Sequence, residues 1–190
     1  ASPYYAGRMR EREAMLATRA ADASVPILYV NLVGGQDELV FDGASMLVDE
    51  TGQLVARAHQ LAEDLLVVDV DVPPAFRAPG LPEVLVTGPQ PPESAHAPRI
   101  EPPLEPVREV YEALAMGTRD YVTKNGFSKV VIGLSGGVDS SLVAAIAVDA
   151  LGPENVVGVM MPSRFSSAGS IADSEALAER LGIRAFTVPI

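Results

Sequence analysis

The front of the chain combines one helical pattern with several runs typical of β-strands. Apolar residues follow a helical period from about Arg8 to Ala23, and charged residues crowd the first turns of that helix. Strand-like runs rich in Val, Ile and Leu follow, and turn-forming residues separate them. The predicted strands are Val25–Val33, Leu39–Val48, Gln53–His59 and Leu65–Val72. The pattern indicates a short-looped β-meander, which we interpret as the closing part of a layered α/β domain whose start we expect to precede this chain.

The rear of the chain alternates strands and helices. An amphipathic helix is predicted from Val107 to about Lys124, because apolar residues recur there every three or four positions. The continuous apolar run Lys129–Leu134 is typical of a strand buried on both faces of a parallel sheet. The later elements are a helix to about Leu151, a strand at Val156–Met161, a helix at Ser170–Leu181 and a strand at Ala185–Val188. This order is the repeating unit of a doubly wound parallel sheet.

Proline marks the boundary between these two regions. Eleven of the 16 prolines lie between Pro73 and Pro106, and such a stretch can hold neither a long helix nor a central strand. We expect an extended, semi-rigid connector that at most a short strand at Glu83–Thr87 interrupts. The predicted organisation is therefore a first domain part at residues 1–72, a connector at 73–106 and a second domain part at 107–190.

Composition narrows the classes of function. Hydrophobic residues make up 48% of the 190 positions, which is enough for a packed core. Acidic residues number 25 against 14 basic ones, and a net charge of −11 argues against a nucleic-acid-binding surface. No apolar run is long enough to cross a bilayer, and the absence of Cys excludes a cysteine nucleophile within this chain. Without a signal peptide or an initiator Met, we expect a cytoplasmic piece of a longer protein, with no membrane or nucleic-acid partner.

The chemistry of the rear half gathers in one segment, Gly133–Ser141 (GLSGGVDSS). It follows a predicted buried strand and opens a helix, which is where open parallel sheets bind ligands. Because Gly136 and Gly137 lack a Cβ, main-chain amides can approach a ligand closely there. Serine hydroxyls and the positive end of the helix add further donors. The sequence therefore predicts an anion-binding loop, with an ordinary Gly/Ser turn as the alternative.

Two common phosphate-binding motifs do not match this loop, and their absence narrows the choice of anion. The dinucleotide fingerprint fails because Ser135 stands where its second glycine belongs, and the common nucleoside-triphosphate loop fails because no Lys follows the glycines. Without that Lys, a bound polyphosphate needs amides, hydroxyls and a metal ion, and Asp139 is the available carboxylate ligand for Mg²⁺. Met161 ends the neighbouring strand, where an adenine ring could stack, although an apolar strand that simply ends in a turn is an equal alternative. The superficially similar segment Gly34–Asp37 (GGQD) lacks serines and a following helix, so we expect a turn with exposed acids.

Several of these segments resemble known families. Ser135–Ser140 (SGGVDS) resembles the pyrophosphate loop of the ATP pyrophosphatases that adenylate a substrate. In the front half, Ser2–Tyr4 (SPY), Arg8 and Asn31–Gly43 resemble segments of nitrilase-like glutaminases. A glutaminase end, a linker and then this loop is an order similar to that of the glutamine-dependent NAD⁺ synthetases. The resemblance implies an α/β chain: the end of a nitrilase-like α-β-β-α sandwich, then the first part of a Rossmann-like, adenine-nucleotide α-hydrolase-like domain with a doubly wound parallel sheet.

The resemblance also implies a reaction. ATP would adenylate the carboxylate of nicotinic acid adenine dinucleotide, and ammonia from glutamine would then displace AMP to give NAD⁺. ATP and Mg²⁺ are the implied cofactors, with Asp139 as the metal ligand, and a homo-oligomer is implied. The implied ATP-binding residues are Gly133, Leu134, Ser135, Gly136, Gly137, Val138, Asp139, Ser140, Ser141 and Met161. Ser2 and Arg8 match residues that hold glutamine, although Arg8 could equally be a solvated charge at a helix start.

The chain departs from that family in one respect. The glutaminases use a Glu, a Lys and a Cys, but this chain has no Cys, and its two lysines, Lys124 and Lys129, lie beyond the connector. We therefore expect no catalytic residue here, place the triad upstream of Ala1, and expect the chain alone to be inactive. The alternatives are another adenylating amidotransferase such as GMP synthetase, a tRNA-thiolating enzyme, or a non-catalytic nucleotide-binding assembly module.

Overall fold

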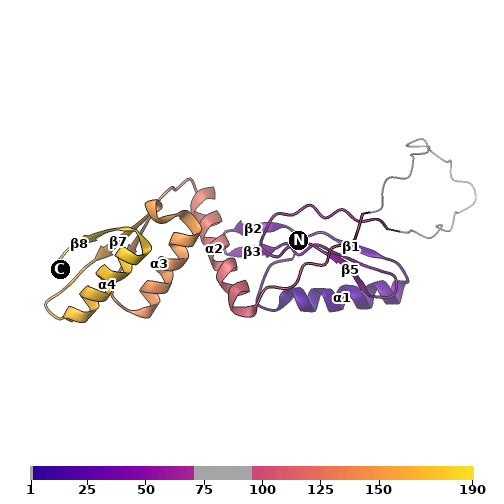
Figure 1. The fold of residues 1–190 in the computed structure, drawn as a ribbon, viewed down its shortest axis with the longest axis horizontal. Coiled ribbons are helices and arrows are strands. Elements are labelled where there is room, and N and C mark those ends of the chain that lie inside the picture. Colours follow the sequence, from indigo (N-terminus) through magenta and orange to yellow (C-terminus); the bar gives the residue numbers. More distant parts are fainter. Residues whose placement is uncertain (1, 71–95) are drawn as a thin grey trace, which may run out of the picture.

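The computed structural model describes residues 2–70 and 96–190 of the chain. A front half and a rear half lie along the long axis of the molecule, with helix α2 (Pro106–Lys124) between them (Figure 1). The strand predicted at Glu83–Thr87 lies outside the described residues. None of the helices in the described ranges has the length and apolar character needed to cross a membrane.

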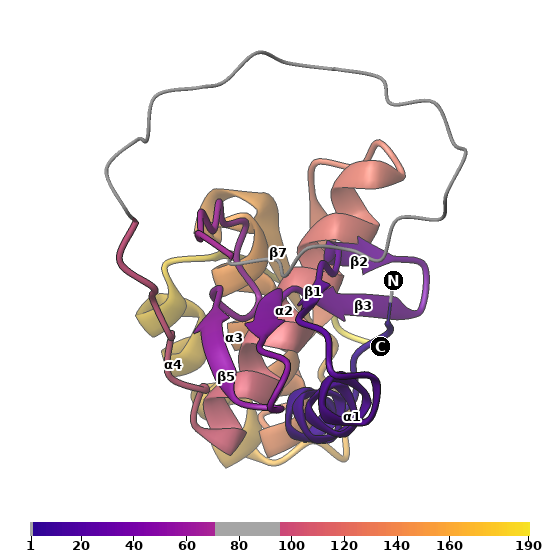
Figure 2. The ribbon, with the colours of Figure 1, turned by 90° about the vertical axis from the view of Figure 1, so that its right-hand side faces the viewer.

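The front half begins with helix α1 (Arg8–Ala23), which confirms the predicted bounds. Five short strands follow: β1 (Ile27–Tyr29), β2 (Val33–Gln36), β3 (Leu39–Asp42), β4 (Met46–Val48) and β5 (Leu54–Arg57). Helix α1 lies to one side of these strands (Figure 2), and its buried Met9, Leu16 and Ala20 pack against Met46 and Val48 of β4. This packing removes the apolar stripe of α1 from water.

The strands do not form the meander that the sequence predicted. Strand β1 pairs antiparallel with β4, β4 with β5, and β2 and β3 form a separate hairpin between them in the chain. The apolar run Leu39–Val48 is split because Gly43 and Ala44 adopt left-handed backbone conformations, with φ of 63° and 51°. Two consecutive left-handed residues cannot continue a strand, so the chain turns from the hairpin into the three-stranded sheet.

The strand predicted at Leu65–Val72 is also wrong for the residues that the structure describes. Residues 65–70 form no strand, and Leu65 is 85% exposed. The edge of β5 is instead occupied by residues from the end of the predicted connector, which is therefore not all a free linker: the Arg57 N–H donates to the Arg99 carbonyl at 2.9 Å and the Glu101 N–H to the Arg57 carbonyl at 3.1 Å. The chain thus returns to the front sheet before it enters α2.

Helix α2 packs closely on the β2–β3 hairpin. Gly34 and Gly35 are buried in β2 against this helix, so the predicted turn is wrong for the glycines, although Asp37 does lie exposed in the hairpin turn. A Cβ on Gly35 would come within 3.1 Å of the Gly117 Cα on α2. The absence of side chains at both positions allows this close approach of strand and helix.

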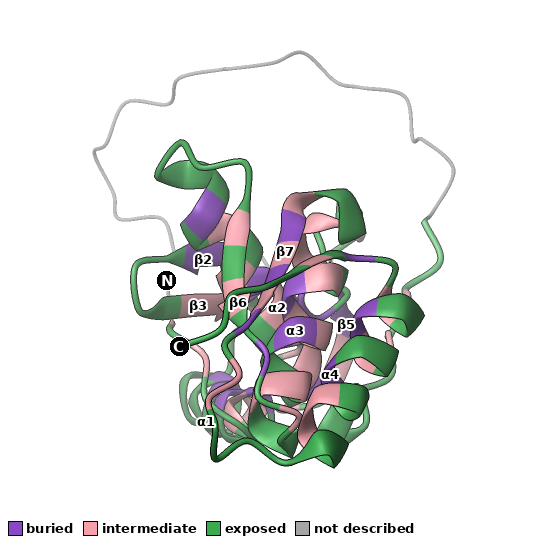
Figure 3. Ribbon diagram, turned by 90° about the vertical axis from the view of Figure 1, so that its left-hand side faces the viewer, coloured by how far each residue is buried: buried purple, intermediate pink, exposed green. Residues whose placement is uncertain are grey.

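The rear half is a three-stranded parallel sheet in the order β6-β7-β8, as the alternating pattern predicts. Its elements are β6 (Val130–Gly133), α3 (Val138–Leu151), a short 3₁₀ turn (Pro153–Asn155), β7 (Val156–Met160), α4 (Ala168–Leu181) and β8 (Arg184–Thr187). Helices α3 and α4 contact each other and the sheet, and Figure 3 shows the buried positions in β7 and α3. The core there includes Val156, Met160 and Ala178.

Strand β6 is not buried on both faces, contrary to the prediction. It is an edge strand of the described sheet, and Val131 is 70% exposed. The helices α3 and α4, which contact one another, pack on one side of the sheet and leave Val131 uncovered. The apolar run in the sequence therefore indicates a strand correctly but overstates how much of it is buried within these residues.

Candidate functional site

The loop between β6 and α3 lies at the carboxyl edge of the parallel sheet, as predicted. The Leu134 N–H donates to the Val159 carbonyl at 2.9 Å, so sheet pairing continues until the loop begins. The loop then turns through Gly136, whose φ is 75°, and α3 starts at Val138. Since α3 begins there, the first N–H groups of its opening turn have no intrahelical acceptor and can bind an anion.

Three serines brace this loop from within. The Ser135 and Ser140 hydroxyls are 3.0 Å apart, and Ser135 Oγ accepts a 3.3 Å hydrogen bond from the Gly137 N–H. The hydroxyls of Ser140 and Ser141 both donate to the Gly137 carbonyl, at 3.0 and 2.8 Å. These bonds fix the main chain of the loop, so the serines hold its shape as well as offering polar groups to a ligand.

The loop is also packed against the start of α4. A Cβ on Gly136 would come 2.4 Å from the Ser170 carbonyl oxygen and 2.8 Å from its Cα. Ser167 caps α4, because its Oγ accepts a 3.0 Å hydrogen bond from the Ser170 N–H. The positive ends of α3 and α4 therefore lie at the same loop, which favours negative charge there.

A cavity of about 260 Å³ opens beside the loop. Its lining residues are Gly133, Leu134, Ser135, Met160, Met161, Pro162, Ser166, Ser170, Ile171 and Ser174. Of the predicted nucleotide-binding residues, Gly133, Leu134, Ser135 and Met161 line the cavity. The other six, Gly136, Gly137, Val138, Asp139, Ser140 and Ser141, form the rest of the loop and the first turn of α3. The main chain and the first turns of two helices thus surround one space.

Sequence reasoning missed the side of this cavity that α4 provides. Ser166 precedes α4, and Ser170, Ile171 and Ser174 lie on it. Ser174 is 1% exposed and its hydroxyl donates to the Ser170 carbonyl at 2.9 Å, so it supports the turn that contacts Gly136. The serine-rich stretch after β7 was the available signal, but its nearness to the loop depends on how α4 packs.

Asp139 lies exposed in the first turn of α3. Within residues 2–70 and 96–190, no three His, Asp or Glu side chains are grouped so that they could hold a metal ion. A single carboxylate fits an Mg²⁺ ion whose other ligands are phosphate oxygens and water. The donor set is therefore suited to a metal that binds together with a polyphosphate.

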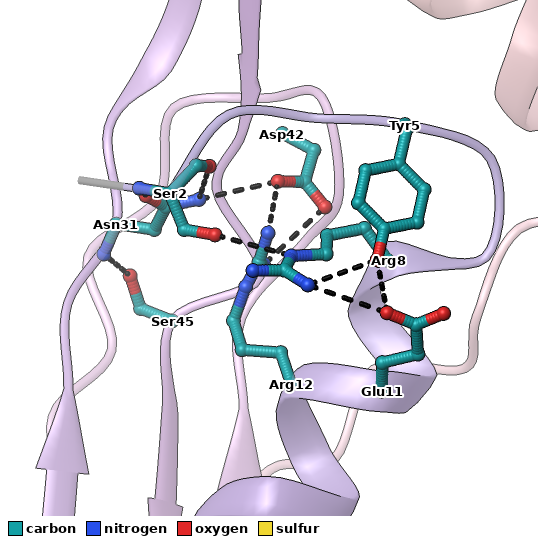
Figure 4. Close-up of polar contacts among 8 residues, drawn as sticks. All are labelled: Ser2, Tyr5, Arg8, Glu11, Arg12, Asn31, Asp42 and Ser45. Atoms are coloured by element: carbon teal, nitrogen blue, oxygen red, sulfur yellow. Dashed lines mark hydrogen bonds and ion pairs between the residues drawn. The ribbon is translucent and has the colours of Figure 1, made fainter.

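The second candidate site lies in the front half, where Ser2 and Arg8, the two residues that the resemblance implies for glutamine, lie close together (Figure 4). Arg8 Nε is 3.5 Å from Ser2 Oγ. Arg8 Nη1 donates to the Tyr5 hydroxyl at 2.9 Å and to Glu11 at 3.3 Å, and its side chain is 37% exposed. The guanidinium is held in place by its neighbours and still faces solvent, so it can receive an anionic group.

A buried ion pair supports this second site. Arg12 Nη2 donates to Asp42 Oδ1 at 2.8 Å and Arg12 Nη1 to Asp42 Oδ2 at 3.4 Å (Figure 4), and the two side chains are 2% and 0% exposed. Arg12 is one of the charged residues that crowd the first turns of α1. Its spacing from Met9 and Leu16 places it on the buried stripe, and that period was the signal.

Comparisons with known proteins connect the two halves. The family model described as carbon-nitrogen hydrolase matches residues 6–75, and the one described as NAD synthase matches residues 110–190. A glutamine-dependent NAD(+) synthetase from Aquifex aeolicus is 48% identical over 100% of this chain and 36% of the relative. One from Thermotoga maritima is 45% identical over 100% of this chain and 35% of the relative. The chain thus spans about a third of the length of the curated relatives that it matches.

Solved structures agree with these matches. A glutamine-dependent NAD+ synthetase from Acinetobacter baumannii, in complex with adenosine diphosphate, gives a TM-score of 0.78 at 37% identity. The match covers 100% of this chain and 33% of that one. A synthetase from Cytophaga hutchinsonii gives a TM-score of 0.76 at 18% identity, over 100% of this chain and 34% of that one, and shows the fold alone. The mixed α/β class and the resemblance stated from the sequence are confirmed.

Proposed function

Because this chain is related along its whole length to glutamine-dependent NAD(+) synthetases, we propose that it forms part of an enzyme that makes NAD⁺. The proposed reaction is the ATP-dependent amidation of nicotinic acid adenine dinucleotide, with glutamine as the source of ammonia. One observation carries the proposal on the structural side: the loop Ser135–Ser140 opens onto a cavity at the positive ends of two helices. That arrangement suits the pyrophosphate end of ATP.

The chemistry explains why such a loop is needed. A carboxylate is a poor electrophile, so its oxygen first attacks the α-phosphorus of ATP, and pyrophosphate leaves. Ammonia then attacks the carbonyl carbon of the acyl adenylate, AMP leaves, and the nitrogen loses a proton to give the amide. The negative charge that develops on the leaving pyrophosphate would lie against the N–H groups at the start of α3. Preorganised amides stabilise that charge without rearranging during the reaction.

Asp139 is the residue that we assign to the metal. Bound Mg²⁺ would supply positive charge to the polyphosphate, which is the role a P-loop Lys takes in other enzymes. Asp139 lies in the first turn of the helix that receives the phosphates, so one carboxylate can orient an ion shared with them. The proposed ATP-binding set otherwise keeps the residues Gly133 to Ser141 and Met161, of which Gly133, Leu134, Ser135 and Met161 line the cavity.

In the front half, we propose that Ser2 and Arg8 bind substrate glutamine. The exposed guanidinium of Arg8 can pair with the glutamine carboxylate, while Tyr5 and Glu11 keep it oriented. This chain holds no Cys, so the nucleophile that releases ammonia would come from outside these residues. The proposed division into parts at 1–72, 73–106 and 107–190 separates the glutamine-binding segment from the synthetase segment.

The proposal favours NAD⁺ synthesis over the other adenylating enzymes. A GMP synthetase shares the loop, but the match of residues 6–75 to carbon-nitrogen hydrolases and of residues 110–190 to NAD synthases supports the present assignment. We further propose a cytoplasmic setting, as the sequence led us to expect. The homo-oligomer that the resemblance implies can be tested by light scattering of the complete polypeptide.

The test is a product assay with the complete polypeptide. It is incubated with nicotinic acid adenine dinucleotide, ATP, Mg²⁺ and either glutamine or ammonium, and the nucleotides are separated by chromatography. We expect NAD⁺, AMP and pyrophosphate in equal amounts. Formation of ADP and phosphate, or turnover of xanthosine monophosphate in place of the dinucleotide, would contradict the proposal.

A further inference from the structure

We propose that Asn31 positions Ser2 for glutamine binding, an inference that rests on the proposed function of the front half. Asn31 lies between β1 and β2 and is 8% exposed. Its Oδ1 accepts a 2.9 Å hydrogen bond from the Ser2 N–H, and its Nδ2 donates to the Ser2 carbonyl at 3.3 Å (Figure 4). One side-chain amide therefore holds both main-chain polar groups of Ser2.

The orientation of the Asn31 amide is set by Asp42. Asn31 Nδ2 also donates to Asp42 Oδ1 at 3.1 Å, and a carboxylate can only accept hydrogen bonds. If the amide were flipped, its oxygen would face the carboxylate and both bonds to Ser2 would be lost. The two hydrogens of Nδ2 are thus divided between Asp42 and Ser2, while Oδ1 is left for the Ser2 N–H.

Asp42 is itself fixed by Arg12 on helix α1. The two side chains form a buried two-point ion pair, and both are almost fully removed from solvent. The main-chain N–H of Asn31 donates to Ser45 Oγ at 3.1 Å, which holds the other side of the residue. A series of contacts therefore runs from Arg12 through Asp42 and Asn31 to Ser2, and each member has little freedom to move.

This series ends at the residue pair that we assign to glutamine. Ser2 Oγ lies 3.5 Å from Arg8 Nε, so the place of the Ser2 main chain determines where its hydroxyl meets the guanidinium. Asn31 does not contact the proposed substrate-binding side chain of Arg8 directly, and its role is to position Ser2. Loss of the two hydrogen bonds from Asn31 to the Ser2 main chain should therefore weaken glutamine binding. It should not disturb the ATP-dependent half-reaction, which we assign to the rear half.

The test compares two nitrogen donors in the complete polypeptide. Rates of NAD⁺ formation are measured against glutamine concentration and, separately, against ammonium concentration, for wild type and Asn31→Ala. We expect Asn31→Ala to raise the KM for glutamine by about ten-fold or more, while kcat with glutamine and the ammonium-supported rate stay within about three-fold of wild type. A purely structural role would lower both reactions together.

Gln60→Ala is the matched control. Gln60 is also 8% exposed in the front half, and its side-chain amide likewise holds a main chain, because Gln60 Oε1 accepts from the Leu104 N–H at 2.8 Å. We expect this variant to leave the KM for glutamine within about two-fold of wild type. If Asn31→Ala does not fold, Asn31→Ser is measured instead. We expect the same rise in the KM for glutamine, because the short hydroxyl of the introduced serine cannot reach both main-chain polar groups of Ser2.

The outcomes separate the two proposals. A wild-type enzyme that makes NAD⁺, together with an Asn31 variant whose KM for glutamine is unchanged or whose two reactions fall in parallel, overturns the positioning role alone. A wild-type enzyme that makes no NAD⁺ from either donor overturns the proposed function and the positioning role with it.

Discussion

Gly136 and Ser170 lie so close together that no side chain fits between them. A Cβ on Gly136 would come 2.4 Å from the Ser170 carbonyl oxygen, and the φ of Gly136 is 75°. The contact joins the loop after β6 to the first turn of α4, so the two helix ends at the cavity are held in one arrangement. A change at Gly136 should therefore act on nucleotide binding through the shape of the loop.

We predict that Gly136→Ala weakens binding of Mg²⁺-ATP by about ten-fold or more, because both the left-handed conformation and the clash must be relieved. Gly169→Ala on α4 is the control, since Gly169 lies in the helix and its Cβ would meet only the Ser167 hydroxyl oxygen, at 3.8 Å. We expect this control to stay within about three-fold of wild type. Titration calorimetry measures both, and equal losses in the two variants would show that the Ser170 contact is unimportant.

Asp139→Asn tests the metal assignment. The amide keeps the shape of the side chain but is a far weaker ligand for Mg²⁺, so we expect the rate of NAD⁺ formation at saturating ATP to fall by about ten-fold or more. Asp173→Asn removes one exposed carboxylate from α4 and should change the rate by less than about two-fold. A rate for Asp139→Asn equal to that of the control, at all Mg²⁺ concentrations, would remove Asp139 from the metal site.

Gly34→Ala tests the contact between α2 and the front half. Gly34 has a φ of 127°, and a Cβ there would come 2.8 Å from Asp120 Oδ2, the atom that accepts the Gly35 N–H. We expect the free energy of unfolding to fall by about 2 kcal/mol or more. Gly126→Ala also places an alanine at a positive φ, 80°, but has nothing within 4 Å, so it should cost only about 1 kcal/mol. Urea unfolding compares them, and equal costs would show that the helix contact adds nothing.

The stretch around Arg99, which pairs with β5 before the chain enters α2, is held by a carboxylate whose effect depends on pH. Hydrogen bonds from the Arg99 guanidinium, with 2.7 Å contacts, and from the His59 main chain hold the pKa of Asp64 well below its usual range. Since the pKa is lower in the folded than in the unfolded chain, this stabilisation is complete above about pH 4 and is lost as pH falls through the folded value.

We therefore predict that Asp64→Asn lowers the free energy of unfolding by about 1 kcal/mol at pH 7, and that the difference from wild type narrows below about pH 4. Urea titrations at pH 7, 4 and 3 would measure it, with the three pH values chosen around the ordinary aspartate pKa of about 3.9. A difference that is the same at all three values would mean that the charge of Asp64 does not stabilise this segment.

The sequence predicted the rear half well because its signals are local. The apolar runs, the glycines of the loop and the serines beside them lie within a few residues of one another, and the helix α2 was predicted to within one residue of its observed start at Pro106. The contribution of Ser170 was not predictable, because it depends on the packing of α4 against a loop 34 positions earlier, where Gly136 stands.

The front half was predicted less well because its contacts span longer distances in the chain. Strand β1 pairs with β4 rather than with its neighbour, and Gly35 owes its burial to Asp120 and Gly117 on a helix beyond the connector. The helical period places Arg12 on the buried stripe of α1, but its partner Asp42 lies 30 positions away and could not be read from that period. Local patterns indicate which residues form strands and helices, but not which of them meet.

The central claim is that the loop Ser135–Ser140 binds the pyrophosphate end of ATP during adenylation of the dinucleotide. Exchange of labelled pyrophosphate into ATP, measured with the complete polypeptide in the absence of glutamine and ammonium, tests this most directly, because only reversible adenylation allows it. We predict exchange that requires nicotinic acid adenine dinucleotide and that falls by about ten-fold or more in Gly136→Ala. Exchange that is absent, or that proceeds equally well in that variant, would contradict the account.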